Sequence, residues 1–355
     1  MNMAGKLVLL TGGTGFVGHA ILLDLLRSGY RVRVAARSQA KVDAVQAAPS
    51  IMALNPPETQ LMFTIVSDMT VPGAYDDAVR DVDLIIHAAA PIHIDEDRSA
   101  SKTLEQRQAA FVATAAQGNL GLLTSAHEKG HAVRRVVMTS STTAIAPASI
   151  YTSAVGTEEH TVPRGPDTRV VVPSPPYASE LEAYCASKAA ALQAAEEFVR
   201  DKKPRFDLIS MMPSWVFGAD ERAASTAEVN LSTAVLVSGL LSSDPGEPAI
   251  GNAVLNSDVA RAHVRALDED VEGNQAFVLN VDVRWGDTTP VAQKYFPEAF
   301  ASGFFREGKR RGTIVPNWHS SKTRDILGID FASYEMMVKE TVGQYLDLAK
   351  KEGRC

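Results

Sequence analysis

The chain has 355 residues, of which 45% are hydrophobic and 22% are charged, an ordinary globular balance. A formal net charge of -7 argues against nucleic-acid binding and against a polybasic contact with a membrane surface. With only Cys185 and Cys355 available for a disulfide, and no apolar run near the roughly 18 residues of a membrane span, we expect a cytoplasmic protein.

Short apolar runs alternate with helix-length segments through most of the chain. Helices are predicted at 20–28 and 111–128. Strands are predicted at 7–10, 32–35, 60–66, 82–87, 135–139, 208–212 and 276–280. Near-continuous apolar strands that alternate with helices predict an α/β fold with a doubly wound parallel sheet of the Rossmann type.

This rhythm breaks in two segments that are richer in Gly, Pro and Ser. The first runs from Val216 to Leu255, and the second runs from Val283 to the end and contains a helical pattern at 333–348. We predict a dinucleotide-binding domain of residues 1–215 plus 253–281, which brings 253–280 back to the main sheet. The remaining residues, 216–252 plus 282–355, are predicted to form a smaller C-terminal substrate-binding lobe.

A glycine turn with G-x-x-G-x-x-G spacing follows the first strand and opens a helix. Its glycines are Gly12, Gly15 and Gly18, which serve a tight turn, a close approach to pyrophosphate and helix packing on the sheet. A plain glycine turn is the alternative, but the strand before it and the helix after it favour a dinucleotide site. The predicted cofactor contacts are Gly12, Thr14, Gly15, Phe16 and Val17.

The end of the second strand indicates which dinucleotide binds. An NAD site places Asp or Glu there, whereas this chain continues with Arg37 and, four residues later, Lys41. The guanidinium of Arg37 can donate two hydrogen bonds to a 2′-phosphate, and the ammonium of Lys41 can add a positive charge. The alternative is that both cations simply face solvent. We predict NADP(H) as the cofactor.

Two further strand ends are placed near the cofactor. Asp68 and Met69 are placed to cover the adenine, and the small residues Ala88, Ala89 and Ala90 allow the chain to pass close to the ribose and phosphates. We interpret His87 as a packed histidine at a strand end.

Tyr184 and Lys188 stand four residues apart, so they share one face of a helix that Ser179 and Glu182 are predicted to open as a capping box. An ammonium near a phenol favours its ionised form and moves its pKa toward neutrality, as acid–base catalysis requires. A serine hydroxyl at the end of the strand 135–139 would polarise a carbonyl oxygen. This spacing of Tyr and Lys is common in helices, and it indicates a catalytic pair only in combination with the glycine turn and the strand that ends in hydroxyl residues.

These motifs resemble those of the extended short-chain dehydrogenases/reductases. Within that superfamily the chain resembles the dihydroflavonol-reductase-like branch, and most closely the fungal and yeast NADPH-dependent aldehyde/ketone (methylglyoxal-type) reductases. The stretches that carry the resemblance run from about residue 6 to 345 and are TGGTGFVG, VRVAARSQAK, SDMTVPGAYDDAV, IIHAAAP, VVMTSST, YCASK, PSWVFG and SSKTRDILGI.

The resemblance implies roles for particular residues. The catalytic residues would be Ser141, Tyr184 and Lys188, with Ser141 preferred to Ser140. Further cofactor contacts would be Thr139, Tyr184, Lys188, Pro213 and Val216. The substrate would face Pro91, Ser141, Thr142, Tyr184 and Trp215.

The sequence departs from the family pattern in two places. Gly121 stands where the family has an asparagine, and Asn256-Ser257-Asp258 replaces a common Asp-Val-Arg-Asp. Cys185 beside the catalytic tyrosine is interpreted as an inert helix residue.

The expected activity is NADPH-dependent reduction of a small-molecule aldehyde or ketone to an alcohol, by a monomer or a homodimer. The alternatives are a nucleotide-sugar epimerase or dehydratase, which retains its NAD, and a non-catalytic protein that senses NADP. The eight histidines show no metal-ligand spacing, so no metal is expected.

Overall fold

The computed structural model describes residues 5–90, 103–153, 155–244, 246–308 and 311–355. Within these ranges, seven parallel strands form one sheet in the order β10-β6-β5-β4-β1-β2-β3. The strands are β1 (Leu7–Thr11), β2 (Arg31–Ala36), β3 (Leu61–Ile65), β4 (Leu84–His87), β5 (Arg135–Thr139), β6 (Asp207–Pro213) and β10 (Gln275–Leu279). The predicted Rossmann-type sheet is therefore confirmed.

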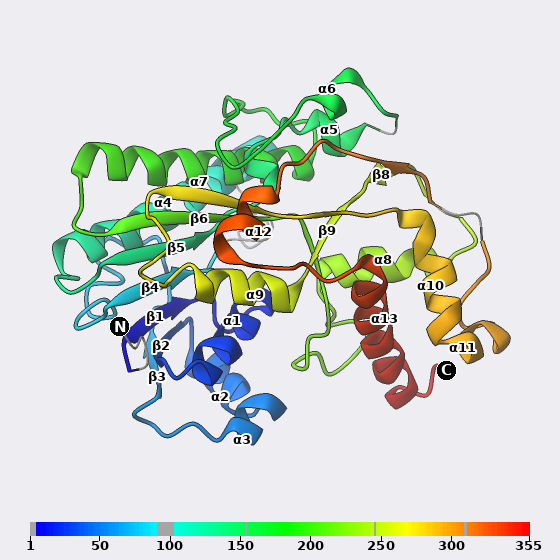
Figure 1. The fold of residues 1–355 in the computed structure, drawn as a ribbon, viewed down its shortest axis with the longest axis horizontal. Helices are drawn as coiled ribbons and strands as arrows, with labels where there is room; N and C mark the ends of the chain where they lie inside the picture. The colour runs from blue at the N-terminus through cyan, green and yellow to red at the C-terminus, as the bar shows by residue number, and fades with distance from the viewer. Residues whose placement is uncertain (1–4, 91–102, 154, 245, 309–310) are drawn as a thin grey trace.

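Helices cover both faces of this sheet (Figure 1). On one face lie α1 (Phe16–Arg27), α9 (Asn256–Arg265) and α12 (Ser321–Leu327), and on the other lie α4 (Leu104–Glu128) and α7 (Glu180–Lys202). Val8 of β1 packs on the first face and Leu9 on the second, and both are fully buried. Burial on both faces is why the strands are continuously apolar.

Two helices begin earlier than the sequence predicts. The helix predicted from residue 20 begins at Phe16, because the glycine turn leads directly into it. The helix predicted from residue 111 begins at Leu104, where Thr103 and Gln106 form a capping box with hydrogen bonds of 3.2 and 2.9 Å. The shorter helices α2 (Gln39–Gln46) and α3 (Pro49–Leu54) follow β2.

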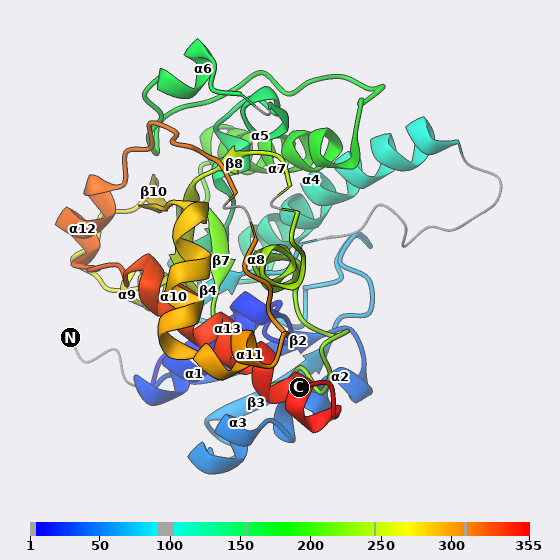
Figure 2. The same cartoon turned by 90° about the vertical axis from the view of Figure 1, so that its right-hand side faces the viewer.

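A second group of elements lies at the right of Figure 1 and faces the viewer in Figure 2. Its core is shared by the helices α8 (Leu231–Leu241), α10 (Thr288–Tyr295), α11 (Pro297–Ala301) and α13 (Tyr334–Lys351). Its sheets are β7 (Trp215–Phe217) with β9 (Asn252–Leu255) and β11 (Val281–Asp282), and β8 (Ala249–Ile250) with β12 (Thr313–Ile314). The short helix η3 (Trp285–Asp287) also belongs to this group, and short helices elsewhere are η2 (Thr142–Ala144), α5 (Ser149–Thr152) and α6 (Glu158–Thr161).

The segment 253–280 returns to the main sheet only in part. Its first residues belong to β9, which pairs with β7 and β11, and only α9 and β10 join the main layers. The proposed boundary between domain and lobe stays a prediction.

Candidate active site

The glycine turn is built for close backbone approach. Gly12 has φ +73°, and a Cβ on it would lie 2.6 Å from the backbone of both Ala88 and Ala89. A Cβ on Gly18 would lie 2.0 Å from the carbonyl oxygen of Gly12. Gly15 caps α1 without a side-chain hydrogen bond, and the first turn of α1 holds no acid. The unpaired N–H groups there fit a pyrophosphate.

The ends of β1 and β4 are tied together beside this turn. The Thr11 hydroxyl lies 2.6 Å from Nδ1 of His87 and accepts a hydrogen bond from the backbone N–H of Ala89 at 3.2 Å. Burial lowers the pKa of His87 to about 4, so the ring is neutral. His87 is thus the packed histidine that was expected, and the backbone of Ala88 and Ala89 passes directly over Gly12.

The predicted adenine and 2′-phosphate contacts lie at neighbouring strand ends. Arg37 follows β2 and Lys41 lies in α2, and both are exposed. Asp68 is also exposed; hydrogen bonds from the Thr70 hydroxyl and N–H lower its pKa, and the Arg37 charge lowers it further. Met69 instead packs against α4, where a Cβ on Gly118 would lie 2.2 Å from its methyl carbon.

The helix that carries Tyr184 begins at Glu180, next to the predicted cap. The Ser179 hydroxyl accepts a hydrogen bond from the N–H of Glu182 at 3.1 Å. The Glu182 carboxylate, however, accepts from the N–H of Ala178 at 2.6 Å, where a capping box would bring it to Ser179. The predicted capping box is therefore only half formed.

Tyr184 and Lys188 share one face of α7, with the lysine nitrogen 5.7 Å from the centre of the tyrosine ring. Ser141 lies opposite, at the end of β5, and is hydrogen-bonded to Tyr184. Its oxygen accepts from the N–H and the hydroxyl of Thr143 at 3.1 and 2.9 Å. Because a hydroxyl has two acceptor positions and one proton, Ser141 is left to act as a donor toward the cleft.

The pKa values of Tyr184 and Lys188 in the structure differ from those that the sequence predicts. Burial raises the pKa of Tyr184 to about 12, although the Ser141 hydrogen bond lowers it in part. Burial also lowers the pKa of Lys188 to about 8. The predicted shift of the phenol toward neutrality is therefore wrong in direction for the protein alone, because desolvation by burial raises the pKa of Tyr184. At pH 7 the phenol is neutral and the lysine is mostly charged.

Thr139 at the end of β5 is held by a histidine that the sequence analysis did not single out. Nδ1 of His263 lies 2.8 Å from the carbonyl oxygen of Val259, and Nε2 lies 2.8 Å from the Thr139 hydroxyl. Burial lowers the pKa of His263 to about 4. In a neutral ring, Nδ1–H donates to the carbonyl, so Nε2 accepts the proton of Thr139. Thr139 therefore presents only acceptor positions to the cleft.

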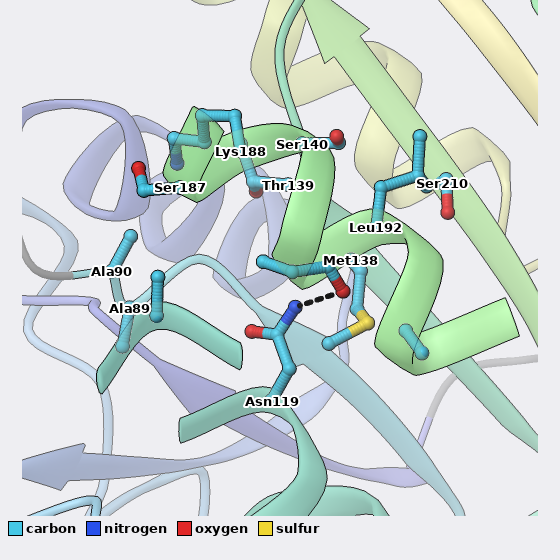
Figure 3. Close-up of a pocket in the computed structure, with 13 residues that line it drawn as sticks. Ala89, Ala90, Asn119, Met138, Thr139, Ser140, Ser187, Lys188, Leu192 and Ser210 are labelled. Carbon is cyan, nitrogen blue, oxygen red and sulfur yellow. Dashed lines mark hydrogen bonds between the residues drawn. The ribbon is translucent and has the colours of Figure 1, made fainter. Parts of the chain in front are cut away.

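A cavity of about 20 Å³ lies beside Lys188, enough for one water molecule (Figure 3). Asn119 of α4 lines it and donates from Nδ2 to the Ala191 carbonyl oxygen at 3.1 Å. It stands two residues before Gly121, the position of the family asparagine. The polar residues around the cavity are Asn119, Thr139, Ser140, Ser187, Lys188 and Ser210.

The remaining predicted contacts lie in different surroundings. Pro213 ends β6, Val216 is buried in β7, and Trp215 packs against the core shared by α8 and α13. Thr142 is 1% exposed, and its hydroxyl accepts from Tyr151 at 3.2 Å. Pro91 lies outside the described residues.

Cys185 is buried, and burial raises the pKa of its thiol to about 12, which fits an unreactive helix residue. Over the described ranges, no helix is long and apolar enough to cross a membrane. Among the same residues, no group of three His, Cys, Asp or Glu side chains could hold a metal ion.

Sequence reasoning missed three residues around this site. Asn119 and His263 lie near the catalytic pair, and Arg222 donates to the carbonyl oxygen of Thr14 in the glycine turn. The run of three charged residues that begins two positions after PSWVFG was the available signal for Arg222.

Residues 8–281 match the model of the NAD dependent epimerase/dehydratase family. Ketoreductase CTB6 of Cercospora nicotianae is 35% identical over 361 residues, covering 99% of this chain and 98% of the relative. Ketoreductase azaE of Aspergillus niger is 30% identical and covers 98% of this chain and 100% of the relative.

Among solved structures, yeast methylglyoxal/isovaleraldehyde reductase Gre2 in complex with NADPH has a TM-score of 0.78 and 23% identity. The alignment covers 99% of this chain and 100% of Gre2, so the likeness in fold extends over the whole protein. The family model and the curated relatives agree with one another. The chain therefore belongs to the NAD dependent epimerase/dehydratase family, the extended short-chain dehydrogenases/reductases that its motifs resemble.

Proposed function

We propose that this protein is an NADPH-dependent reductase that converts an aldehyde or ketone into an alcohol. The observation that carries the proposal is the arrangement of Ser141, Tyr184 and Lys188 at the carboxyl edge of the sheet, beside the ends of β1 and β4. The names of the curated relatives, two of them ketoreductases, support the same chemistry.

In this proposal each polar group has one task. NADPH, when bound, supplies the hydride that adds to the carbonyl carbon. Ser141 donates a hydrogen bond to the carbonyl oxygen and stabilises the charge that develops there. Tyr184 gives its phenolic proton to that oxygen, completing the alcohol, and Lys188 stabilises the phenolate that remains. A phenol with a pKa of about 12 starts this step protonated, as the reductive direction requires.

The cofactor would lie across the carboxyl edge of the sheet. Gly12–Val17 would hold its pyrophosphate, Arg37 and Lys41 its 2′-phosphate, and Lys188 its nicotinamide ribose. The other proposed contacts are Asp68, Met69, Ala88, Ala89, Ala90, Thr139, Pro213 and Val216. Lys188 fits this role because it is a cation enclosed by protein, whose burial lowers its pKa to about 8.

The substrate is proposed to be a small molecule that meets Ser141 and Tyr184 and is faced by Pro91, Thr142 and Trp215. A monomer or homodimer in the cytoplasm remains our expectation.

The test is to offer the purified protein NADPH or NADH with a panel of aldehydes, diketones and ketoesters while following the loss of reduced cofactor. Turnover with NADPH and at least one carbonyl, with the matching alcohol as product, is the expected result. No turnover with any carbonyl, together with tight binding of a UDP-sugar, would instead identify an epimerase or dehydratase.

Replacing Arg37 with alanine should raise the KM for NADPH about tenfold to a hundredfold, because hydrogen bonds to a charged group contribute about 1.5–3 kcal/mol. The KM for NADH should change by less than about twofold, since NADH lacks the phosphate. Arg31→Ala, at the other end of β2, is the matched control and should change neither constant. Equal losses for both cofactors would show that Arg37 does not read the phosphate.

A further inference from the structure

Three consecutive charged residues, Asp220, Glu221 and Arg222, cross from the second group of elements to the glycine turn; we call them the 220–222 strap. The strap is fixed to α13 at its beginning. The N–H of Gly218 donates to the Thr341 hydroxyl, and the N–H of Asp220 donates to Oε1 of Gln344, both at 2.9 Å. Gln344 also returns a hydrogen bond to the carbonyl oxygen of Asp220.

Glu221, the middle residue of the strap, is hydrogen-bonded to α1, the helix that begins at the glycine turn. One carboxylate oxygen of Glu221 lies 2.8 Å from Nε2 of His19, which is buried in α1. The other accepts from the N–H and the hydroxyl of Ser50, at 3.0 and 2.8 Å, in the first turn of α3. Glu221 thereby fixes where its neighbour Arg222 stands relative to α1.

Arg222 extends over the turn itself, with its orientation set by Asp220. Nε and Nη2 donate to the two carboxylate oxygens of Asp220 at 2.9 and 2.7 Å, and Nη1 donates to the carbonyl oxygen of Thr14. A guanidinium carries five N–H donors, and these contacts use three, which leaves one on each terminal nitrogen. The side chain is 18% exposed, so these donors lie in a partly dehydrated environment.

We infer that Arg222 binds the pyrophosphate of the dinucleotide, as a cofactor contact that reaches the glycine turn from the second group of elements. The inference rests on the proposed cofactor. Thr14 directly precedes Gly15, whose helix presents the unpaired N–H groups that fit a pyrophosphate. A helix end supplies only about half a positive charge, whereas a pyrophosphate carries two negative charges. Arg222 adds two hydrogen-bond donors and a cation at the same place.

Asp220 makes the contact geometrically specific. Its bidentate pairing fixes the plane of the guanidinium before the cofactor arrives, so little side-chain entropy remains to be lost on binding. The carboxylate also offsets part of the charge. The contact therefore acts mainly through directed hydrogen bonds, and lysine at position 222 should replace it incompletely.

The experiment compares ligands that all carry the 2′-phosphate but differ at the 5′ position of the same ribose, where NADPH has a pyrophosphate, 2′,5′-ADP has a single phosphate and 2′-AMP has none. Binding of NADPH, 2′,5′-ADP and 2′-AMP is measured by titration calorimetry for the wild type, Arg222→Met and Arg222→Lys. Arg222→Met should weaken NADPH about tenfold or more, as expected for lost hydrogen bonds to a charged group. It should leave 2′-AMP, which has no 5′-phosphate, within about twofold of the wild type. Arg222→Lys should give an intermediate loss for NADPH and a loss for 2′,5′-ADP in the same direction, because both ligands carry a 5′-phosphate.

Arg265→Met is the matched control, because Arg265 pairs with Asp268 and Asp270 after α9 and no proposed cofactor contact lies among its partners. It should leave all three affinities unchanged. An equal loss for NADPH and 2′-AMP in both Arg222 variants, or no loss for either ligand, would overturn the inference. A wild-type protein that binds none of the ligands would contradict the proposed cofactor itself. If the methionine variant fails to fold, the lysine variant decides between these outcomes.

Discussion

Replacing Tyr184 with phenylalanine should reduce kcat for carbonyl reduction by about 10²- to 10⁴-fold, the range that general acid catalysis contributes. The phenol is the group that places a proton on the substrate oxygen, and phenylalanine keeps the ring but loses that proton. Affinity for NADPH should change by less than about threefold, because the glycine turn and Lys188 remain in place. Steady-state kinetics and a fluorescence titration with NADPH measure the two quantities separately.

Tyr30→Phe is a suitable control for that variant. Tyr30 is 2% exposed, and burial raises its pKa to about 12, the value found for Tyr184. It packs against the first face of the sheet, in the core formed with α1 and α9. Tyr30→Phe should therefore keep the activity of the wild type. Retention of more than about a tenth of the wild-type kcat by Tyr184→Phe would exclude Tyr184 as the acid.

The parts of the fold that depend on local pattern could be predicted from the sequence. The inner strands of the main sheet bury side chains on both faces, and the apolar runs therefore mark them closely; β5 was predicted at its observed bounds, Arg135–Thr139. The glycine turn could be interpreted because Gly12 and Gly18 occupy positions where a Cβ would collide with backbone. Tyr184 and Lys188 followed from helical spacing.

Contacts between distant segments could not be predicted in this way. The hydrogen bond between Thr139 and His263 joins residues 124 apart, and that between Arg222 and Thr14 joins residues 208 apart. Neither partner carries a local signal for the other. The sequence analysis brought residues 253–280 back to the main sheet as one piece, whereas β9 pairs with β7 and β11, because the choice between two sheets is made by tertiary packing and not by the four residues of the strand.

The pKa of Tyr184 could not be predicted from the sequence either, because it depends on burial by distant segments. Helical spacing places an ammonium beside the phenol, and from the sequence this charge is the only visible influence. The structure adds the desolvation of both groups, which raises the pKa of the phenol to about 12 and lowers that of Lys188 to about 8. For reduction, the lysine rather than the tyrosine is therefore the group whose charge changes near physiological pH.

It follows that kcat/KM for NADPH should be nearly constant below about pH 7, should be halved near pH 8, and should fall about tenfold per pH unit above about pH 9. The ammonium of Lys188 is the active form; it is present below its pKa of about 8 and is lost as the pH rises through that value. Tyr184, with a pKa of about 12, stays protonated over this range and cannot produce the fall. The ratio kcat/KM for the cofactor reports the ionisations of the free enzyme, in which Lys188 has no bound ribose beside it.

Two variants assign this loss of activity to Lys188. Lys188→Arg keeps a cation at every pH used, because a guanidinium does not deprotonate, so its lower activity should not depend on pH up to 10. Lys188→Met should lose about 10²- to 10⁴-fold relative to the wild type at pH 7, since neither the phenolate nor the ribose then has a cationic partner, and this difference should narrow above pH 8 as the wild-type ammonium is lost. Far-ultraviolet circular dichroism at each pH serves as the check on folding. A wild-type profile that stays flat to pH 10, or an arginine variant that keeps the same fall, would show that another group titrates. Such a result would also mean that the Lys188 ammonium does not stabilise the phenolate. The roles proposed for Tyr184 as the acid and Lys188 as its cationic partner would then be wrong.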